Sequence, residues 1–300
     1  MFKNSLAFLI TTIFLIQLAF AQSMTPVNTA INQAPVKSDE NPFSISLFMI
    51  GGYSDQQFRN ANPSFDIFDS YLAFNYNINP DVRISARPAF GYSTDGVNKY
   101  SDKVGDRSRI RDFSFAGSIR NILENILDDS LSLKFKPRLY LPTSDGSKDQ
   151  GMIASFLAET ELKYYLSRYN SFKFYIKPKY YFQRNTVYLD NSIPSRPNYL
   201  KQTTMMDSEH GLEFNYDISK FFALKPIVAF EESWSNTSSV NTSKEADQYH
   251  KTTIFYGGGI EIKPTRDFSF TVGVRTTKDL ITPAKTEETG YSILTDISVF

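Results

Sequence analysis

The sequence contains no cysteine, and this absence excludes several classes of protein at once. Without a thiol the chain carries no lipoprotein anchor, no disulfide framework and no thiolate zinc site. Only two histidines are left for metal chemistry, so we expect no metal and no other cofactor. Basic and acidic residues number 32 each, and the resulting net charge of zero gives no reason to expect nucleic-acid binding.

Long hydrophobic runs are also scarce, and residues 6–20 form the one that stands out. Lys3 precedes this run, and the small-residue site Ala19-Phe20-Ala21 follows it. The run is short for a spanning helix, which needs roughly 20 residues, and its flanks are those of a secretory signal peptide. We predict a signal peptide over residues 1–21, cleaved after Ala21. The polar, proline-containing residues 22–42 are then a flexible periplasmic leader, with a plug domain as the less favoured alternative.

What the sequence does have is an alternation of apolar and polar residues that continues from residue 43 to the end. It is clearest over residues 82–92, 131–141 and 172–182, where one set of alternate positions is apolar and the other is rich in lysine, arginine and tyrosine. Successive side chains of a strand point to opposite faces, so each segment predicts a strand with one apolar and one charged face. Alternation alone would also fit a soluble sandwich.

The connections between these segments favour a membrane barrel over a sandwich. Short and long connections alternate, as periplasmic turns and extracellular loops do in outer-membrane barrels. The 26 phenylalanines and 18 tyrosines combine with a mean hydropathy of −0.32, which is expected when a polar lumen dilutes an apolar outer face. We predict an all-β chain that forms one closed antiparallel transmembrane β-barrel over residues 43–300. Its twelve expected strands are 43–53, 67–78, 82–93, 110–121, 131–141, 153–166, 172–184, 204–218, 222–232, 251–262, 268–277 and 290–300.

On this architecture the chain resembles the bacterial outer-membrane β-barrel superfamily, and in particular porin-like barrels of about twelve strands. The resemblance implies a bacterial outer-membrane location and contact with outer-membrane lipid. It also implies assembly by the barrel-assembly machinery through a C-terminal strand ending in Phe300. One detail departs from the usual pattern: Phe300 is in phase with Asp296 and Ser298 rather than with the apolar residues. A bulge near the end, or a lumen-facing Phe300, would reconcile the two.

The charged face supplies the candidate functional residues. Four strands carry a cation followed by proline, namely Arg87-Pro88, Lys136-Pro137, Lys177-Pro178 and Lys225-Pro226. Each proline belongs to the apolar face, so we expect the four cations to point into the lumen at similar depth and the prolines to weaken strand pairing. The predicted lumen or constriction residues are Arg83, Arg87, Lys134, Lys136, Arg138, Glu159, Glu161, Lys177, Lys179, Glu209, Glu213 and Lys225.

Two interpretations of these charges remain open. In the first, the cations form an electropositive constriction that favours anions. In the second, carboxylates on neighbouring strands neutralise them and the lumen is filled by ion pairs. Turns centred near Tyr169 and Ser219 would support the second interpretation. They would pair Glu161 with Lys177, Glu159 with Lys179 and Glu213 with Lys225.

An enzymatic role has weak support. His210 is in phase with apolar residues and is expected to face lipid, as a catalytic histidine of an outer-membrane phospholipase would. Two positions further on, however, stands Leu212 rather than a nucleophile. We therefore predict a non-enzymatic, porin-like channel for small hydrophilic solutes. The alternative is a non-conducting barrel that acts through its long extracellular loops, and an outer-membrane lipid hydrolase is less expected.

Overall fold

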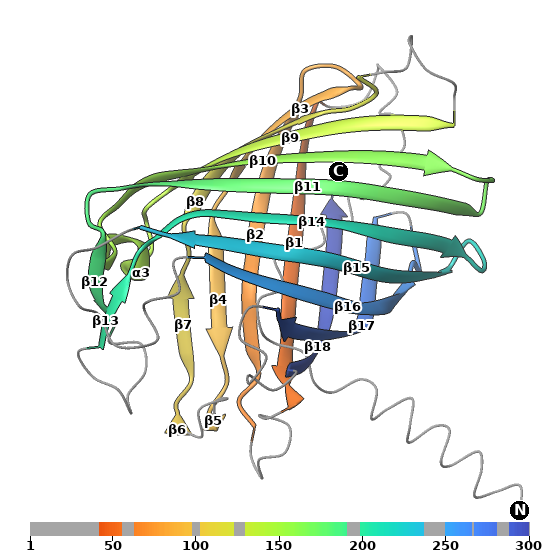
Figure 1. Ribbon diagram of the computed structural model, residues 1–300. Helices are drawn as coiled ribbons and strands as arrows, with labels where there is room; N and C mark the ends of the chain where they lie inside the picture. The colour runs from red at the N-terminus through yellow and green to blue at the C-terminus, as the bar shows by residue number, and fades with distance from the viewer. Residues whose placement is uncertain are drawn as a thin grey trace, which may run out of the picture.

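The protein is one closed antiparallel β-barrel of twelve strands (Figure 1), as the sequence predicts. The computed structural model describes residues 42–55, 63–97, 103–122, 130–190, 199–236, 250–265, 267–280 and 288–299. The third strand of the barrel is split into β3 and β4, and the fourth into β7 and β8. The wall consists of β1 (Phe43–Ser54), β2 (Asp66–Asn77), β3 (Val82–Arg87), β4 (Ala89–Ser93), β7 (Arg107–Ile110), β8 (Phe113–Ile119), β9 (Leu131–Leu141), β10 (Met152–Tyr165), β11 (Asn170–Gln183), β14 (Thr204–Asp217), β15 (Phe222–Ser235), β16 (His250–Ile262), β17 (Phe268–Asp279) and β18 (Glu288–Val299).

The barrel closes where the first strand meets the last. β1 pairs with β2 on one side and with β18 on the other, from Ile45 opposite Val299 to Ser54 opposite Gly290. A closed sheet leaves no unpaired edge in a membrane. No helix in the described parts of the chain is long and apolar enough to cross a membrane. The loops carry β5 (Gly96–Val97), β6 (Lys103–Val104), α3 (Asp145–Asp149), β12 (Val187–Asp190) and β13 (Tyr199–Gln202).

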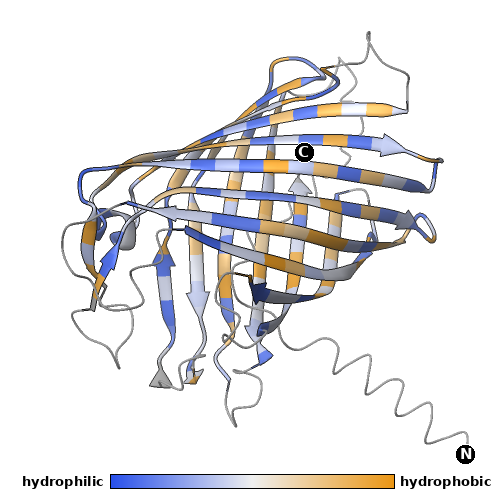
Figure 2. Ribbon diagram, viewed as in Figure 1, coloured by the Kyte–Doolittle hydropathy of each residue, from blue (hydrophilic) through white to orange (hydrophobic). Residues whose placement is uncertain are grey.

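Most apolar side chains of the wall lie on the outside of the barrel and most charged ones on the inside, although Phe48, Ile50 and Leu294 form a buried apolar cluster on the inner face. Figure 2 shows the two kinds alternating along the strands of the wall. Ile176, Phe230 and Ile260 are 40 %, 37 % and 46 % exposed, which is where lipid would cover them. Leu133, Phe135, Phe214 and Val272, also predicted to face lipid, occupy the same outward phase of their strands. The buried residues of the described chain are mostly serine and charged residues, so this is not a soluble sandwich.

Three of the short turns share one local device. Asn79 Oδ1 accepts hydrogen bonds from the backbone N–H of Asp81 and Val82, at 2.9 and 2.8 Å. Ser167 Oγ and Ser219 Oγ likewise accept from the N–H groups two and three residues further on. Asparagine and serine favour such turns because their side-chain oxygen satisfies backbone donors that the turn leaves free. These side chains therefore set where each hairpin turns.

The four prolines of the cation–proline dipeptides interrupt the wall in the same way. Near each proline, two residue pairs drop out of the ladder with the preceding strand. The paired residues on either side of each gap are as follows: Phe74–Ala86 and Tyr71–Ala89 at Pro88, Ala116–Arg138 and Ile119–Phe135 at Pro137, Leu157–Lys179 and Thr160–Ile176 at Pro178, and Glu213–Ile227 and Tyr216–Leu224 at Pro226. Proline lacks the N–H that a ladder needs. Weakened pairing at these positions agrees with the expectation from the sequence.

Several sequence predictions fall outside the described residues. Residues 1–41, which contain the predicted signal peptide and most of the predicted leader, belong to this group, and so does Phe300. In β18 the buried positions are Ser292, Leu294 and Asp296, while Ile293 is exposed. Asp296 therefore lies on the buried, inward face of β18, opposite to the exposed Ile293.

Candidate lumen site

All twelve predicted lumen residues lie on the charged, inward phase of their strands. Lys136, Arg138, Glu159, Glu161, Lys177, Glu209 and Glu213 are buried, and Arg83, Arg87, Lys134, Lys179 and Lys225 are half-buried. The structure sorts most of them into two groups with different electrostatic surroundings. One group is paired with carboxylates and the other rests on tyrosine rings, while Arg83 and Lys134 belong to neither.

The paired group is centred on four residues that lie side by side on consecutive strands. Lys136 of β9 is opposite Glu159 of β10, and Lys177 of β11 is opposite Glu209 of β14. Lys136 Nζ lies 3.2 Å from Glu159 Oε1, and Lys177 Nζ lies 3.0 Å from Glu209 Oε1. We call Lys136, Glu159, Lys177 and Glu209 the charge row. Opposite charges across neighbouring strands stabilise the wall and leave the row with no net charge.

The charge row corrects the ion pairs expected from the sequence. Glu161 lies opposite Tyr175 rather than Lys177, and its Oε1 is 2.6 Å from Lys136 Nζ. Lys179 lies opposite Leu157 on β10, so the expected Glu159–Lys179 pair is also wrong.

The third expected pair fails in the same way. Glu213 Oε2 binds Lys173 Nζ at 2.9 Å, while Lys225 Nζ binds Glu261 Oε2 at 2.9 Å. The physical reason is the position of the turns. Tyr165 is opposite Ser171, and Asp217 is opposite Ala223, so each turn is centred one residue away from the expected Tyr169 and Ser219. A shift of one residue in the centre of a turn moves every partner by two.

The four cation–proline residues do not form one ring. Lys136 and Lys177 belong to the charge row, but Lys225 lies level with Asn215, because Leu224 is opposite Tyr216. Asn215 stands six residues along β14 from Glu209, which is the partner of Lys177. The four cations therefore do not share one hydrogen-bonded row of the sheet. Their similar depth stays a prediction, because staggered strands separate depth from register.

The second group is a cluster of cations and tyrosines on the inner face of β2, β3, β9 and β11. We call Tyr71, Arg87, Arg138, Tyr140 and Lys179 the arginine–tyrosine cluster. The guanidinium carbons of Arg87 and Arg138 lie 4.8 and 5.7 Å from the centre of the Tyr71 ring. Arg138 Nη1 donates to Tyr140 Oη at 3.0 Å, and Lys179 Nζ lies 4.4 Å from the Tyr140 ring centre. Cations on tyrosine faces are stabilised by the ring quadrupole.

The cations of the arginine–tyrosine cluster have no carboxylate partner. Among the described residues, no carboxylate oxygen lies within 4.0 Å of Arg87, Arg138 or Lys179, and the same holds for Arg83 and Lys134. Arg87 Nε donates to Ser85 Oγ at 3.1 Å, and Arg83 Nε donates to Asn77 Oδ1 at 2.8 Å.

Carboxylates still lie near the cluster at a greater distance, and Asp207 of β14 is opposite Lys179 in the pairing register. Glu159 acts electrostatically on both arginines, and Asp296 acts on Arg87. Glu159, however, is already bound to Lys136 in the charge row. This side of the lumen therefore carries positive charge that is not neutralised at contact distance.

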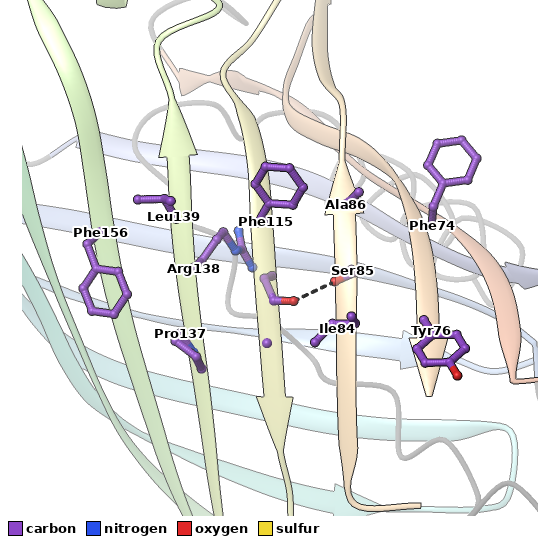
Figure 3. A pocket seen from close by; sticks show the side chains of 12 residues that line it. Phe74, Tyr76, Ile84, Ser85, Ala86, Phe115, Pro137, Arg138, Leu139 and Phe156 are labelled. Atoms are coloured by element: carbon purple, nitrogen blue, oxygen red, sulfur yellow. Dashed lines mark hydrogen bonds between the residues drawn. The ribbon is translucent and has the colours of Figure 1, made fainter. Parts of the chain in front are cut away.

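A hollow of about 530 Å³ lies against the same wall. Figure 3 shows four of its lining side chains, Phe156, Leu139, Phe115 and Phe74, following one another across β10, β9, β8 and β2, with Pro137 of β9 beside them. These side chains belong to the outward phase, and a side chain at Gly117 would come within 3.1 Å of Pro137 Cγ. The hollow is thus a depression in the apolar wall at the interrupted seam between β8 and β9.

The structure places apolar side chains beside His210. His210 stacks on the outward-facing Phe230 with ring centres 5.6 Å apart, and Leu212 beside it is 42 % exposed. Ser208, on the other side, is buried. Among the described residues, no three of histidine, aspartate and glutamate gather as a metal site requires.

Comparison with solved structures identifies the architecture. An outer membrane channel from Pseudomonas putida F1 is 10 % identical, over 86 % of this chain and 95 % of that one, with a TM-score of 0.56. The chain has the porin-like fold of bacterial outer-membrane channels. At this identity the likeness shows the fold alone. The NanC porin also matches, at 10 % identity over 84 % of this chain and 98 % of that one, with a TM-score of 0.47. No family model matches the sequence, and no curated protein matches it significantly.

This fold and the outward apolar face belong to a protein of the bacterial outer membrane. The barrel also contains lumen residues that sequence reasoning did not assign to the site. Glu261, the partner of Lys225, and Tyr71 and Tyr140 of the arginine–tyrosine cluster are the main ones. The alternation of side chains along each strand would have placed these residues inside the barrel. Their contacts depend on the pairing register, which the turn residues Asn79, Ser167 and Ser219 could have indicated.

Proposed function

We propose that the barrel is a channel for small hydrophilic solutes across the outer membrane. The observation that carries this proposal is the inner face, which places charged and hydroxyl side chains around a twelve-stranded wall. Side chains fill the interior of an eight-stranded barrel, and the diameter grows with strand number. A wider barrel with a polar lining is suited to hydrated solutes.

The two groups of lumen charges contribute differently to such a channel. The charge row is neutral within itself and braces the wall. The arginine–tyrosine cluster supplies positive charge without a contacting carboxylate, so the proposed channel favours anions. Screening by salt should weaken this preference, since exposed charges act over about 10 Å at 0.1 M ionic strength.

The alternative is a non-conducting barrel that acts through its outer loops. It is supported by the ordered elements that these loops carry, including α3 and the hairpin of β12 and β13, in which Val187 pairs with Gln202. Figure 1 shows this hairpin beyond the end of the wall. A lipid hydrolase stays the least supported alternative, because Leu212 stands where a nucleophile is needed.

Recording from refolded protein in planar bilayers tests the proposal. We expect steady single-channel conductance and, in a potassium chloride gradient, a reversal potential on the anion side. A barrel that is folded by its gel mobility but electrically silent would contradict the channel and favour the loop-presenting barrel. We also propose that outer-membrane lipid surrounds the wall and that the assembly machinery engages the C-terminal strand β18.

A further inference from the structure

The arginine–tyrosine cluster holds two guanidinium groups against one ring. Arg87 and Arg138 both lie over Tyr71, which itself stacks on Phe48 with ring centres 5.0 Å apart. Tyr71 belongs to β2, Arg87 to β3 and Arg138 to β9, so three strands hold the two cations in place. Like charges brought together in this way repel each other. The arrangement gains stability when an anion lies between them.

No carboxylate of the described residues supplies that anion at contact distance, although Glu159 and Asp296 act on the arginines from further away. Arg138 is opposite Ala116 on one side and Leu157 on the other, and Arg87 is opposite Ser114. None of these residues carries a charge. The charge row, whose Lys136 stands two residues from Arg138 on β9, has carboxylates, but its lysines bind them at 3.0 and 3.2 Å.

The N–H groups of Arg87 and Arg138 that remain free define the chemistry of the anion that could bind them. A guanidinium carries five N–H donors in a planar fork. Arg87 uses Nε toward Ser85 and Arg138 uses Nη1 toward Tyr140. Each guanidinium keeps further N–H groups that no acceptor of the described protein takes up. A planar carboxylate matches this fork with two parallel hydrogen bonds, whereas chloride does not.

From these contacts we infer that Arg87 and Arg138 form a binding site for the carboxylate groups of a small solute inside the lumen. Two guanidiniums suit a dicarboxylate, with one carboxylate on each. The site deepens the proposed channel and rests on it for its role in transport. Its chemistry can nevertheless be measured without conduction.

Titration calorimetry on the refolded full-length barrel in detergent, at low ionic strength and with succinate as the probe, tests the site. We expect saturable binding whose dissociation constant rises at least tenfold in Arg87→Gln and in Arg138→Gln. Lys173→Gln is the matched control, since Lys173 is a lumen cation already bound to Glu213 at 2.9 Å. Its dissociation constant should stay within twofold.

The conservative variants Arg87→Lys and Arg138→Lys keep the positive charge and lose the planar guanidinium. They test the carboxylate site if the glutamine variants do not fold. We expect each to raise the dissociation constant at least threefold. Unchanged succinate binding in these variants, no binding to the unaltered protein, or equally tight binding of inorganic phosphate or chloride would overturn the site. Arginine-dependent succinate binding by an electrically silent barrel would contradict the proposed channel function but support the binding site. Conductance without succinate binding would support the channel function and contradict the binding site.

Discussion

Lys225 of β15 forms its ion pair with Glu261 of the following strand, at 2.9 Å, and not with a carboxylate of the preceding one. Glu261 also binds Lys263 at 2.8 Å. We expect a double-mutant cycle of Lys225→Gln and Glu261→Gln to give a coupling of about 1–2 kcal/mol, because residues that share a salt-bridge network couple in that range. The measurement is urea unfolding of the barrel in lipid vesicles. A cycle of Lys225 with Glu213 is the control and should couple more weakly, since Glu213 binds Lys173. Equal coupling in both cycles would contradict the observed register.

Ion selectivity should depend on the cations that lack carboxylate partners. The double variant Arg87→Gln with Arg138→Gln removes two positive charges from the lumen wall. We expect its reversal potential in a potassium chloride gradient to move toward the potassium side, and to move less at high salt. The matched control is Lys173→Gln with Glu213→Gln, which removes one cation together with its carboxylate and keeps the net charge. A control that shifts the potential as far as the arginine variant would show that the cluster does not set selectivity.

Gly257 of β16 leaves no room for a side chain against β17. An added Cβ there would clash with the carbonyl oxygen of Val274 and lie 2.8 Å from Arg275 Cα, both backbone atoms that cannot rotate away. We expect Gly257→Ala to lower the free energy of unfolding by about 1–3 kcal/mol, as overpacking does. Gly146→Ala in α3 has open space around it and should leave the urea midpoint nearly unchanged. An unaffected Gly257→Ala barrel would mean that these strands lie further apart.

The side-chain oxygen of Ser219, rather than its small size, should stabilise the turn between β14 and β15. Ser219→Ala removes the acceptor of the Phe221 and Phe222 N–H groups, which lie at 3.1 and 3.2 Å. We expect a loss of about 1 kcal/mol in the free energy of unfolding. Ser219→Asn should retain most of the stability, because Asn79 performs the same task in the first short turn. If asparagine proved as damaging as alanine, the side-chain oxygen would not be what holds the turn.

The sequence was sufficient for the barrel and insufficient for its contacts. Alternation and sorted loop lengths predict twelve strands, and every lumen residue from Arg83 to Lys225 lies in the predicted phase. Whether a side chain faces the lumen or the lipid follows from counting along one strand. Which ion pairs form depends on how neighbouring strands are aligned. An error of one residue at the centre of a turn was enough to assign Lys177 and Lys225 to the wrong glutamates. The break at Pro88 that separates β3 from β4 was anticipated only as weakened pairing.

The prolines also have a consequence for how the wall behaves mechanically. Each interrupted seam joins two wall strands that follow one another in sequence, and a short turn links three of these four pairs. Pairing runs unbroken on the far side of Pro137, Pro178 and Pro226. The wall therefore has four short gaps in its ladder, each beside a proline. Because fewer hydrogen bonds hold the strands together there, we expect the wall to bend more easily at these gaps than elsewhere, while the closure of β1 on β18 stays intact.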